Sequence, residues 1–152
     1  MLGDEPVLPP AALPDGDLEA LNDAELVWAA QHRELVTGLC EGQADVETLS
    51  RLFDRVQAGW LASADRDDPH TLVNAFGIAL GDLLVSRLPG MRWQVYTDAR
   101  GPELVLAHPV HDLVVFPISS VARQWGHAPE DWFARYADDV TEGARAILGD
   151  GS

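Results

Sequence analysis

The sequence predicts an α+β protein in which helices come first, a three-stranded antiparallel meander follows, and helices return at the end. Up to about Leu88, apolar residues recur at the three- and four-residue steps of a helix. Pro89 and Gly90 then mark a change to the two-residue alternation of strands, and helical spacing returns after Ile118. Elements in this order are typical of a domain whose helices pack over one face of a sheet.

The first segment of the chain lacks the side chains that build a core. Residues 1–16 are rich in prolines and acids and hold few large apolar groups, so they cannot bury enough surface to offset the entropy of ordering. We expect a flexible tail over 1–16, one domain over 17–148 and a frayed end over 149–152. A chain of 152 residues has the size at which one hydrophobic core closes well.

Two helices are expected next. The first runs from Asp17 or Asp23 to Gly38, where the apolar stripe ends and a turn follows. The second starts at Asp45, because its carboxylate can accept hydrogen bonds from the free amides of a first turn. It continues to about Trp60 and is followed by an Asp-rich loop.

A third helix, from Pro69 to Leu88, is apolar on almost every side, so we expect it to be central and buried. Gly77 and Gly81 stand four residues apart and therefore share one face, where the missing side chains allow another element to approach closely. We expect close packing against the sheet there. The alternative is a ligand pocket between this helix and the meander.

The meander and two further helices complete the chain. Strands are expected at Trp93–Thr97, Leu104–Ala107 and Leu113–Ile118, with short turns between them. The segment after the last strand is expected to form a short helix that ends near Trp125. Its predicted cap is one of two adjacent serines, Ser119 or Ser120.

The last helix has a well-marked start at Pro129, Glu130 and Asp131. Proline suits the first helical position, and the two acids favour the positive end of the helix dipole. The helix then presents an apolar side through about Ile147.

Four of these segments together resemble a known family. They are the helix LVNAFGIALGDLL at 72–84, the strand around Trp93, the segment LVVFPISSVARQWG at 113–126 and the aromatic start of the last helix at Trp132. Over about residues 71–148 this arrangement resembles the bacterial domain of unknown function DUF3806. The resemblance implies an α+β fold and a bacterial, cytosolic setting, and it implies no catalytic residues.

The charge balance limits the partners of the chain. It holds 25 acidic residues against 10 basic ones, all of which are Arg, and the net charge is −15. Such a charge repels nucleic-acid phosphates and anionic membranes and favours a basic partner. No apolar run of membrane-spanning length and no basic, apolar leader occur, and Cys40 is the single cysteine. We therefore expect a cytoplasmic protein that binds neither nucleic acid nor membranes.

A few residues are candidates for chemistry. His108, His111 and Asp112 place two imidazoles and a carboxylate in one loop, and zinc accepts such ligands, although a fourth ligand is missing. Turn composition accounts for these residues equally well. Cys40 lies near the end of a helix, where a packing role and a raised pKa are expected rather than a reactive thiolate.

The candidate binding residues are weaker. Arg123 and Trp125 could present a cation and an aromatic surface to an anion or a peptide, since both residue types are frequent in binding hot spots. Asn74 lies in an otherwise apolar helix, where its amide needs partners; we expect these to be backbone groups of a sheet edge or a loop. Trp93 on the first strand completes this set.

These features favour a non-catalytic protein-interaction or accessory domain without a cofactor, whose acidic surface meets a protein partner that is itself basic. An immunity-type protein that neutralises a toxin would fit the size and the charge. The alternatives are a small-molecule-binding regulatory domain and a metal-dependent hydrolase built on the two histidines.

Overall fold

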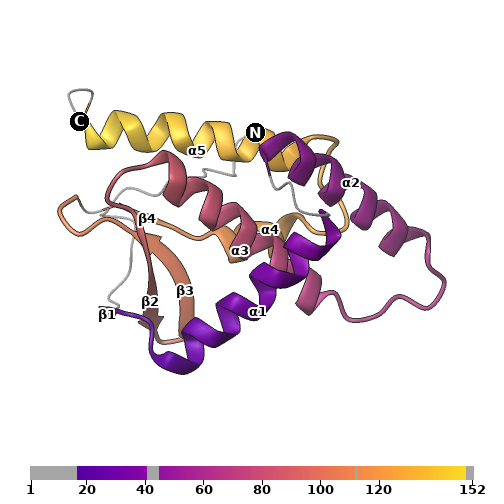
Figure 1. The fold of residues 1–152 in the computed structure, drawn as a ribbon, viewed down its shortest axis with the longest axis horizontal. Coiled ribbons are helices and arrows are strands. Elements are labelled where there is room, and N and C mark those ends of the chain that lie inside the picture. The colour runs from indigo at the N-terminus through magenta and orange to yellow at the C-terminus, as the bar shows by residue number, and fades with distance from the viewer. Residues whose placement is uncertain (1–16, 41–44, 112, 150–152) are drawn as a thin grey trace.

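The computed structural model describes residues 17–40, 45–111 and 113–149. The predicted tail at 1–16, Asp112 and residues 150–152 lie outside this part of the chain. The described residues form helices and strands in the following order: β1 (Asp17–Glu19), α1 (Asp23–Leu39), α2 (Val46–Ala62), α3 (His70–Arg87), β2 (Arg92–Asp98), β3 (Gly101–Ala107), β4 (Val114–Val115), α4 (Pro117–Gln124) and α5 (Trp132–Leu148). Helices before and after one antiparallel sheet confirm the predicted α+β class (Figure 1).

In the described part of the chain the sheet has four strands in the order β1-β2-β3-β4, whereas the sequence predicts three. The additional strand, β1, pairs with β2 and places Leu18 opposite Tyr96. Of the two starts expected for the first helix, Asp17 is wrong and Asp23 is right, because Asn22 caps the helix: its side chain accepts from the amide of Glu25 at 2.8 Å. At the second helix, the predicted cap is confirmed, since Asp45 accepts from the Thr48 amide.

The last predicted strand, Leu113–Ile118, is too long. Only Val114–Val115 pairs with β3, because Pro117 has no amide hydrogen for a ladder and takes the first position of α4 instead. Ser119 and Ser120 therefore lie inside this helix and cap nothing. The Ser119 hydroxyl donates to Glu103, and the Ser120 hydroxyl lies 2.7 Å from the Tyr136 hydroxyl.

The start of α5 also differs from the prediction. Pro129, Glu130 and Asp131 precede the helix, and Asp131 takes a left-handed conformation with φ 67°. Two contacts with α2 hold it there. The Asp131 amide donates to Asp54 at 2.9 Å, and the Asp131 carboxylate accepts from the Ser50 hydroxyl at 2.8 Å. A tertiary contact thus overrides the local helix-start signal.

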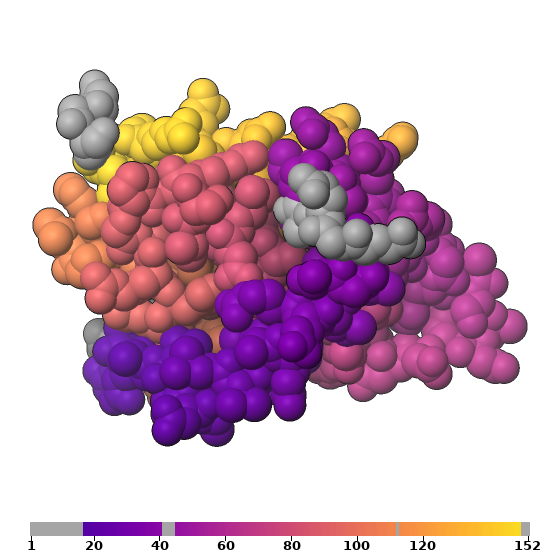
Figure 2. Space-filling model, in the orientation of Figure 1, coloured from indigo at the N-terminus to yellow at the C-terminus, as the bar shows by residue number. Residues whose placement is uncertain are grey.

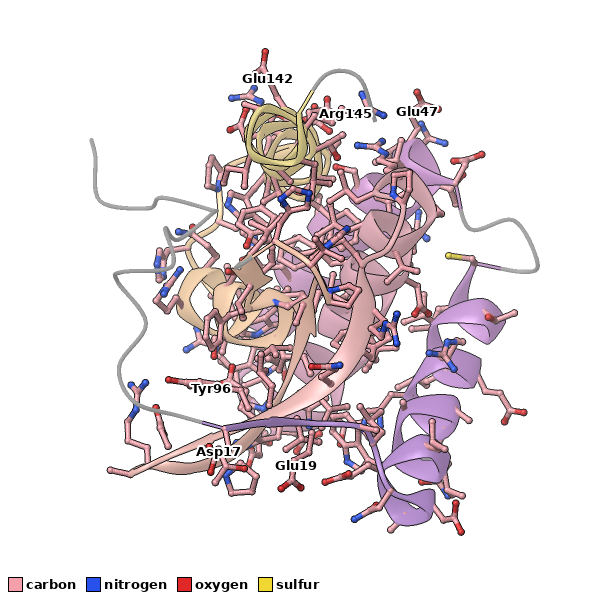
Figure 3. The ribbon with its side chains drawn as sticks, turned by 90° about the vertical axis from the view of Figure 1, so that its left-hand side faces the viewer. Asp17, Glu19, Glu47, Tyr96, Glu142 and Arg145 are labelled. Carbon is pink, nitrogen blue, oxygen red and sulfur yellow. The ribbon has the colours of Figure 1, made fainter. Side chains whose placement is uncertain are left out.

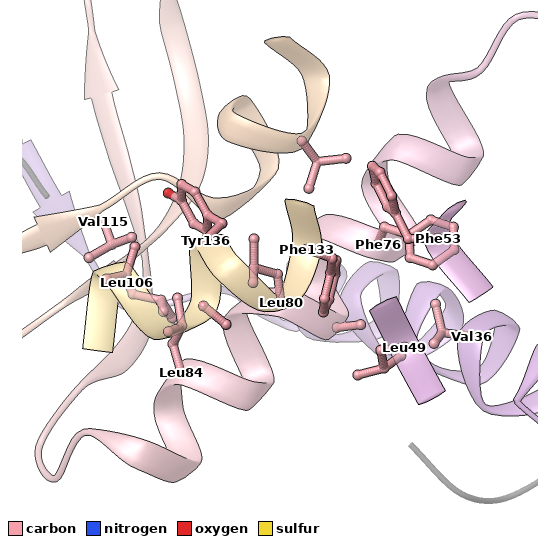
Figure 4. Close-up of a cluster of buried hydrophobic side chains, with 14 of the residues drawn as sticks. Val36, Leu49, Phe53, Phe76, Leu80, Leu84, Leu106, Val115, Phe133 and Tyr136 are labelled. Carbon is pink, nitrogen blue, oxygen red and sulfur yellow. The ribbon is translucent and has the colours of Figure 1, made fainter. Parts of the chain in front are cut away.

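α3 is the central helix, as its all-round apolar sequence predicts, and nine of its residues are buried. It contacts every other helix and β3. Phe76 of α3 packs edge-on against Phe53 of α2, with ring centroids 5.2 Å apart, and Phe133 of α5 completes the cluster (Figure 4). On the side of the sheet, Leu80 and Leu84 belong to the same continuous core as Leu106 and Val115.

The predicted close packing against the sheet is confirmed at Gly81 and is wrong at Gly77, which packs closely against a helix. A Cβ atom at Gly77 would lie 2.7 Å from the Cα of Ile118 in α4, and one at Gly81 would lie 2.1 Å from the Trp93 ring of β2. Gly81 thus packs on the sheet, whereas Gly77 packs on a helix. Because Ile118 and Trp93 fill the space beside both glycines, no ligand pocket opens at these two positions.

Candidate functional site

Arg123 and Trp125 do not form a common surface. Trp125 is 8% exposed and packs in the core, with its ring centroid 5.5 Å from that of Phe53 and 5.9 Å from that of Trp60. Arg123 is exposed on α4. Trp125 is therefore a packing residue of the core, while Arg123 faces solvent.

Asn74 and Trp93 also differ from each other in their hydrogen bonds. Asn74 is half-buried on α3, and no hydrogen bond joins its amide to the described residues, so the expected backbone partners are not found there. Trp93 donates from Nε1 to Oδ1 of Asp82 at 3.0 Å. Arg33 donates to both oxygens of the same carboxylate, at 2.6 and 3.1 Å, and this bond raises the pKa of Arg33. Asp82 thus joins α1, α3 and β2.

The two candidate metal ligands, His108 and His111, do lie together, with ring centroids 4.9 Å apart. Nδ1 of His108 accepts from the backbone amides of Val110 and His111, each at 3.1 Å. This nitrogen is therefore unprotonated and already occupied, which leaves it unavailable to a metal. Asp112 lies outside the described residues, and within them no group of three or more ligating side chains could hold a metal ion.

The same two histidines line an open groove of about 840 Å³ between the ends of α3 and α5. We call it the α3–α5 groove. Its lining residues are Arg87, Pro89, His108, His111, Glu142, Arg145, Ala146, Leu148 and Gly149. A volume of this size falls within the range of about 300–1,000 Å³ that is usual for small-molecule sites.

The two arginines of the groove differ in their partners. Arg87 is largely buried and donates from Nη1 to Asp138 at 3.0 Å and to Thr141 at 3.2 Å, so its charge is balanced and it joins α3 to α5. Arg145 is exposed and forms no ion pair with any residue that the structure describes. Figure 3 shows Arg145 and Glu142 on the outer part of α5, seen along the helix axis. Of the two arginines, Arg145 is thus the one without an ion pair in the described part of the chain.

A second candidate surface lies on α1. This helix of 17 residues buries only Ala29 and Val36, and Figure 2 shows it along the border of the molecule beside α3. Trp28, Leu35 and Leu39 are spaced by seven and four residues, so they share one flank of the helix. We call these three residues the α1 stripe. Leu35 and Leu39 are 36% and 38% exposed, and Trp28 is half-buried.

A polar face of α2, formed by Ser50, Asp54 and Gln57, holds the loop between α4 and α5. Oε1 of Gln57 accepts from the amides of Gly126 and Ala128, at 2.8 and 3.2 Å. Burial raises the pKa of Asp54, and the neighbouring charges of Glu130 and Asp131 add to the increase. This arrangement is structural, since Ser50, Asp54 and Gln57 each hydrogen-bond to the protein's own backbone or side chains.

Cys40 takes the place that the sequence predicts, at the C-terminal cap of α1. Burial raises the pKa of its thiol, and the nearby Asp45 raises it further, so the expected raised pKa is confirmed. A thiol with this pKa is poorly suited to nucleophilic chemistry.

In the described part of the chain, none of the helices combines the length and apolar character that a membrane crossing requires.

Two comparisons with known proteins bear on this arrangement. A search of curated proteins gives no match. A crystal structure from Bacteroides thetaiotaomicron VPI-5482, at 1.50 Å resolution, has the same fold, with a TM-score of 0.56 and 17% sequence identity. The match covers 82% of this chain and 47% of that one, so this chain corresponds to about half of its structural neighbour.

The fold defines a small α+β domain with a buried central helix. Along the chain, helices both precede and follow the strands β2 to β4. The chain belongs to the family described as "Domain of unknown function (DUF3806)", whose model matches residues 45–136. This match confirms the resemblance seen in the sequence. β1 and α1 precede the matched range.

The sequence did not point to Arg87, Glu142 or Arg145, nor to the α1 stripe. Arg145 and Glu142 are ordinary charged residues on an amphipathic helix, and no local signal separates them from their neighbours. Their association with the two histidines depends on the folded arrangement of α3, α5 and the loop after β3.

Proposed function

We propose that this protein is a non-catalytic interaction domain that docks a protein partner through the α1 stripe. The observation that carries the proposal is the exposure of large apolar side chains on a helix that contributes two residues to the core. Leu26 and Val27 of the same helix are also more than half exposed. Leu26 and Val27 lie on other sides of the helix, whereas the three residues of the α1 stripe share one flank, and several apolar residues together on one exposed flank mark an interaction surface.

Charge indicates the kind of partner. α1 carries Asp23, Glu25 and Glu34, and its single arginine, Arg33, is already engaged by Asp82. The helix therefore combines exposed apolar side chains with acidic residues that no ion pair of the described structure compensates. A partner with an apolar patch bordered by Arg or Lys residues is complementary to it. An immunity-type role, in which that partner is a toxin, is one form of this function.

The test compares Leu35→Glu/Leu39→Glu with the control Val110→Glu. Val110 is 78% exposed on the loop after β3, far along the chain from α1, so the control adds charge at another exposed apolar position. A photoactivatable cross-linker is placed at Leu35 in one sample and at Val110 in another, and cross-linking is carried out in a lysate of the host. Circular dichroism and thermal unfolding check that each variant keeps its fold.

The expected result is one specific partner that cross-links from position 35 and not from position 110. It should be retained by the control variant, lost from the double variant and released by salt, because salt screens surface charge. Equal cross-linking from both positions, or equal retention by both variants, would contradict the proposal. So would sedimentation showing that the cross-linked partner is a second copy of this chain.

A further inference from the structure

We propose that the α3–α5 groove binds a small organic anion with a carboxylate or phosphate group, held by Arg145 and His111. This site lies on elements other than the α1 stripe, so it can exist whether or not α1 docks a partner. Some polar groups of the groove already have hydrogen-bond partners within the protein, and others are available to a ligand.

The walls of the groove are fixed before any ligand arrives. His108 accepts two backbone amides through Nδ1, and Gly90, with φ 89°, lets the ring pack so closely that a Cβ at Gly90 would lie 2.5 Å from Nε2. Arg87 is held by Asp138 and Thr141. These contacts set the spacing between α3, α5 and the loop after β3, so a ligand does not have to order them.

Arg145 and His111 are two hydrogen-bond donors that remain available in this fixed frame. The Arg145 guanidinium and the His111 ring make no side-chain hydrogen bond to the residues that the structure describes, and both line the groove. A guanidinium presents paired N–H donors that match the two oxygens of a carboxylate or phosphate. Pro89, Ala146 and Leu148 add apolar surface for the body of an organic molecule.

The overall acidity of the protein does not exclude an anion here. Two of the ten arginines and two of the five histidines line this one groove. At physiological ionic strength, exposed charges more than about 8 Å away are largely screened, so the nearest side chains decide the local potential. Of the acidic side chains that the structure describes here, Glu142 opposes an anion, while Asp138 is compensated by Arg87.

The opposite signs of Arg145 and Glu142 allow a sharp experiment. Inorganic phosphate and succinate are titrated separately into the full-length protein at low ionic strength. Binding is followed by NMR, using the imidazole resonances of His111 and the backbone amides of the groove. Three variants are compared with the parent: Arg145→Gln, Glu142→Gln and the control Arg135→Gln, an exposed arginine on the same helix that does not line the groove.

At least one of the two anions should bind at millimolar concentration. Arg145→Gln should weaken that binding by about tenfold or more, because a hydrogen-bonded charge pair is lost. Glu142→Gln should strengthen it several-fold, and Arg135→Gln should leave it unchanged. The anion that binds more tightly identifies the acid group that the site prefers.

Three results would overturn the inference. The first is the absence of groove-specific shifts with both anions. The second is an equal loss of affinity in Arg135→Gln and Arg145→Gln, which would show diffuse attraction to α5. The third is weaker binding in Glu142→Gln, which the charge argument forbids. Glutamine keeps good helix propensity, so each variant is expected to retain α5.

Discussion

Gly77 fixes the distance between α3 and α4 through the side chain that it lacks. A Cβ atom at this position would lie 2.6 Å from Cγ1 of Ile118 and 2.7 Å from its Cα. The second contact is with backbone, so α4 itself would have to move to make room. The sequence places Gly77 and Gly81 on one face and predicts close packing, but only the fold shows that their neighbours are Ile118 and Trp93.

Replacing Gly77 with Ala should destabilise the protein. Overpacking costs about 1–3 kcal/mol, and occasionally more. The better helix propensity of alanine stabilises the helix by about 1 kcal/mol, which is less than the clash with the backbone of α4 costs. The matched control is Gly59→Ala in α2, where nothing lies within 4 Å of the added methyl group. Denaturant unfolding should show a loss for Gly77→Ala and a gain of about 0.5–1 kcal/mol for Gly59→Ala; stabilisation by both changes would refute this packing argument.

Asp54 should make stability depend on pH. Its pKa is raised in the folded state by burial and by the nearby Glu130 and Asp131. The folded state therefore binds the proton more tightly than the unfolded state, so this group's contribution to stability falls as pH rises from the ordinary Asp range through the raised pKa. Oδ2 accepts from the Asp131 amide, whereas Oδ1 is buried and has no partner among the described residues.

Asp54→Asn removes the charge and keeps a carbonyl oxygen for the Asp131 amide. At neutral pH the variant should be at least as stable as the parent, and its advantage should shrink as the pH falls and Asp54 of the parent becomes protonated. Denaturant unfolding of both proteins across the acidic range measures this difference. A variant advantage that grows on acidification would show that the direction of the pKa shift is wrong.

The contacts of α2 explain why α5 starts later than local sequence predicts. Ser50, Asp54 and Gln57 recur at helical spacing, which the sequence shows, but their partners are the loop residues 126–131, more than 65 positions later. Local propensity at Pro129 favours a helix start there. The contacts with α2 hold Asp131 in a left-handed conformation instead, and such long-range contacts cannot be read from local spacing.

Gln57→Ala should loosen this junction. The change removes the acceptor of the Gly126 and Ala128 amides and the donor to the Ala128 carbonyl, all at a side chain only 6% exposed. Leaving buried polar groups unpaired should cost about 2–3 kcal/mol. Hydrogen exchange at the two amides should accelerate. The control Gln31→Ala, on the exposed side of α1, should change stability by no more than about 0.5 kcal/mol, and an equal effect of the two changes would refute the role of Gln57.

At the scale of the whole molecule, the order of helices and strands follows from the periodicity of apolar residues, and the central place of α3 from its all-round apolar sequence. β1 does not follow. Asp17–Glu19 has two acids in three residues, and its strand conformation comes from pairing with β2, nearly eighty positions away. The α3–α5 groove has the same origin, since it joins residues from 87 to 149 that share no local pattern.

The uneven burial of the helices predicts that the molecule opens in parts. α1 buries two residues, whereas α3 buries nine. Local opening needs little free energy where few apolar contacts are broken. The amides of α1 should therefore exchange with deuterium through a partial opening, while those of α3 should exchange only through global unfolding. Native-state hydrogen exchange in low denaturant separates the two classes, and identical free energies for α1 and α3 would contradict this prediction.

Arg33→Gln tests which contact holds α1 in place. Arg33 pairs with Asp82 at the surface, with about 45% and 34% of the two side chains exposed, and such pairs contribute up to about 1 kcal/mol. The variant should lower the opening free energy of α1 by up to that amount and leave the α3 amides unchanged, since Asp82 still accepts from Trp93. Arg51→Gln, an exposed change on α2 at a residue without an ion pair in the described structure, should leave both classes unchanged. If α3 exchange accelerates as much as α1 exchange, the pair stabilises the whole fold, and α1 does not open separately.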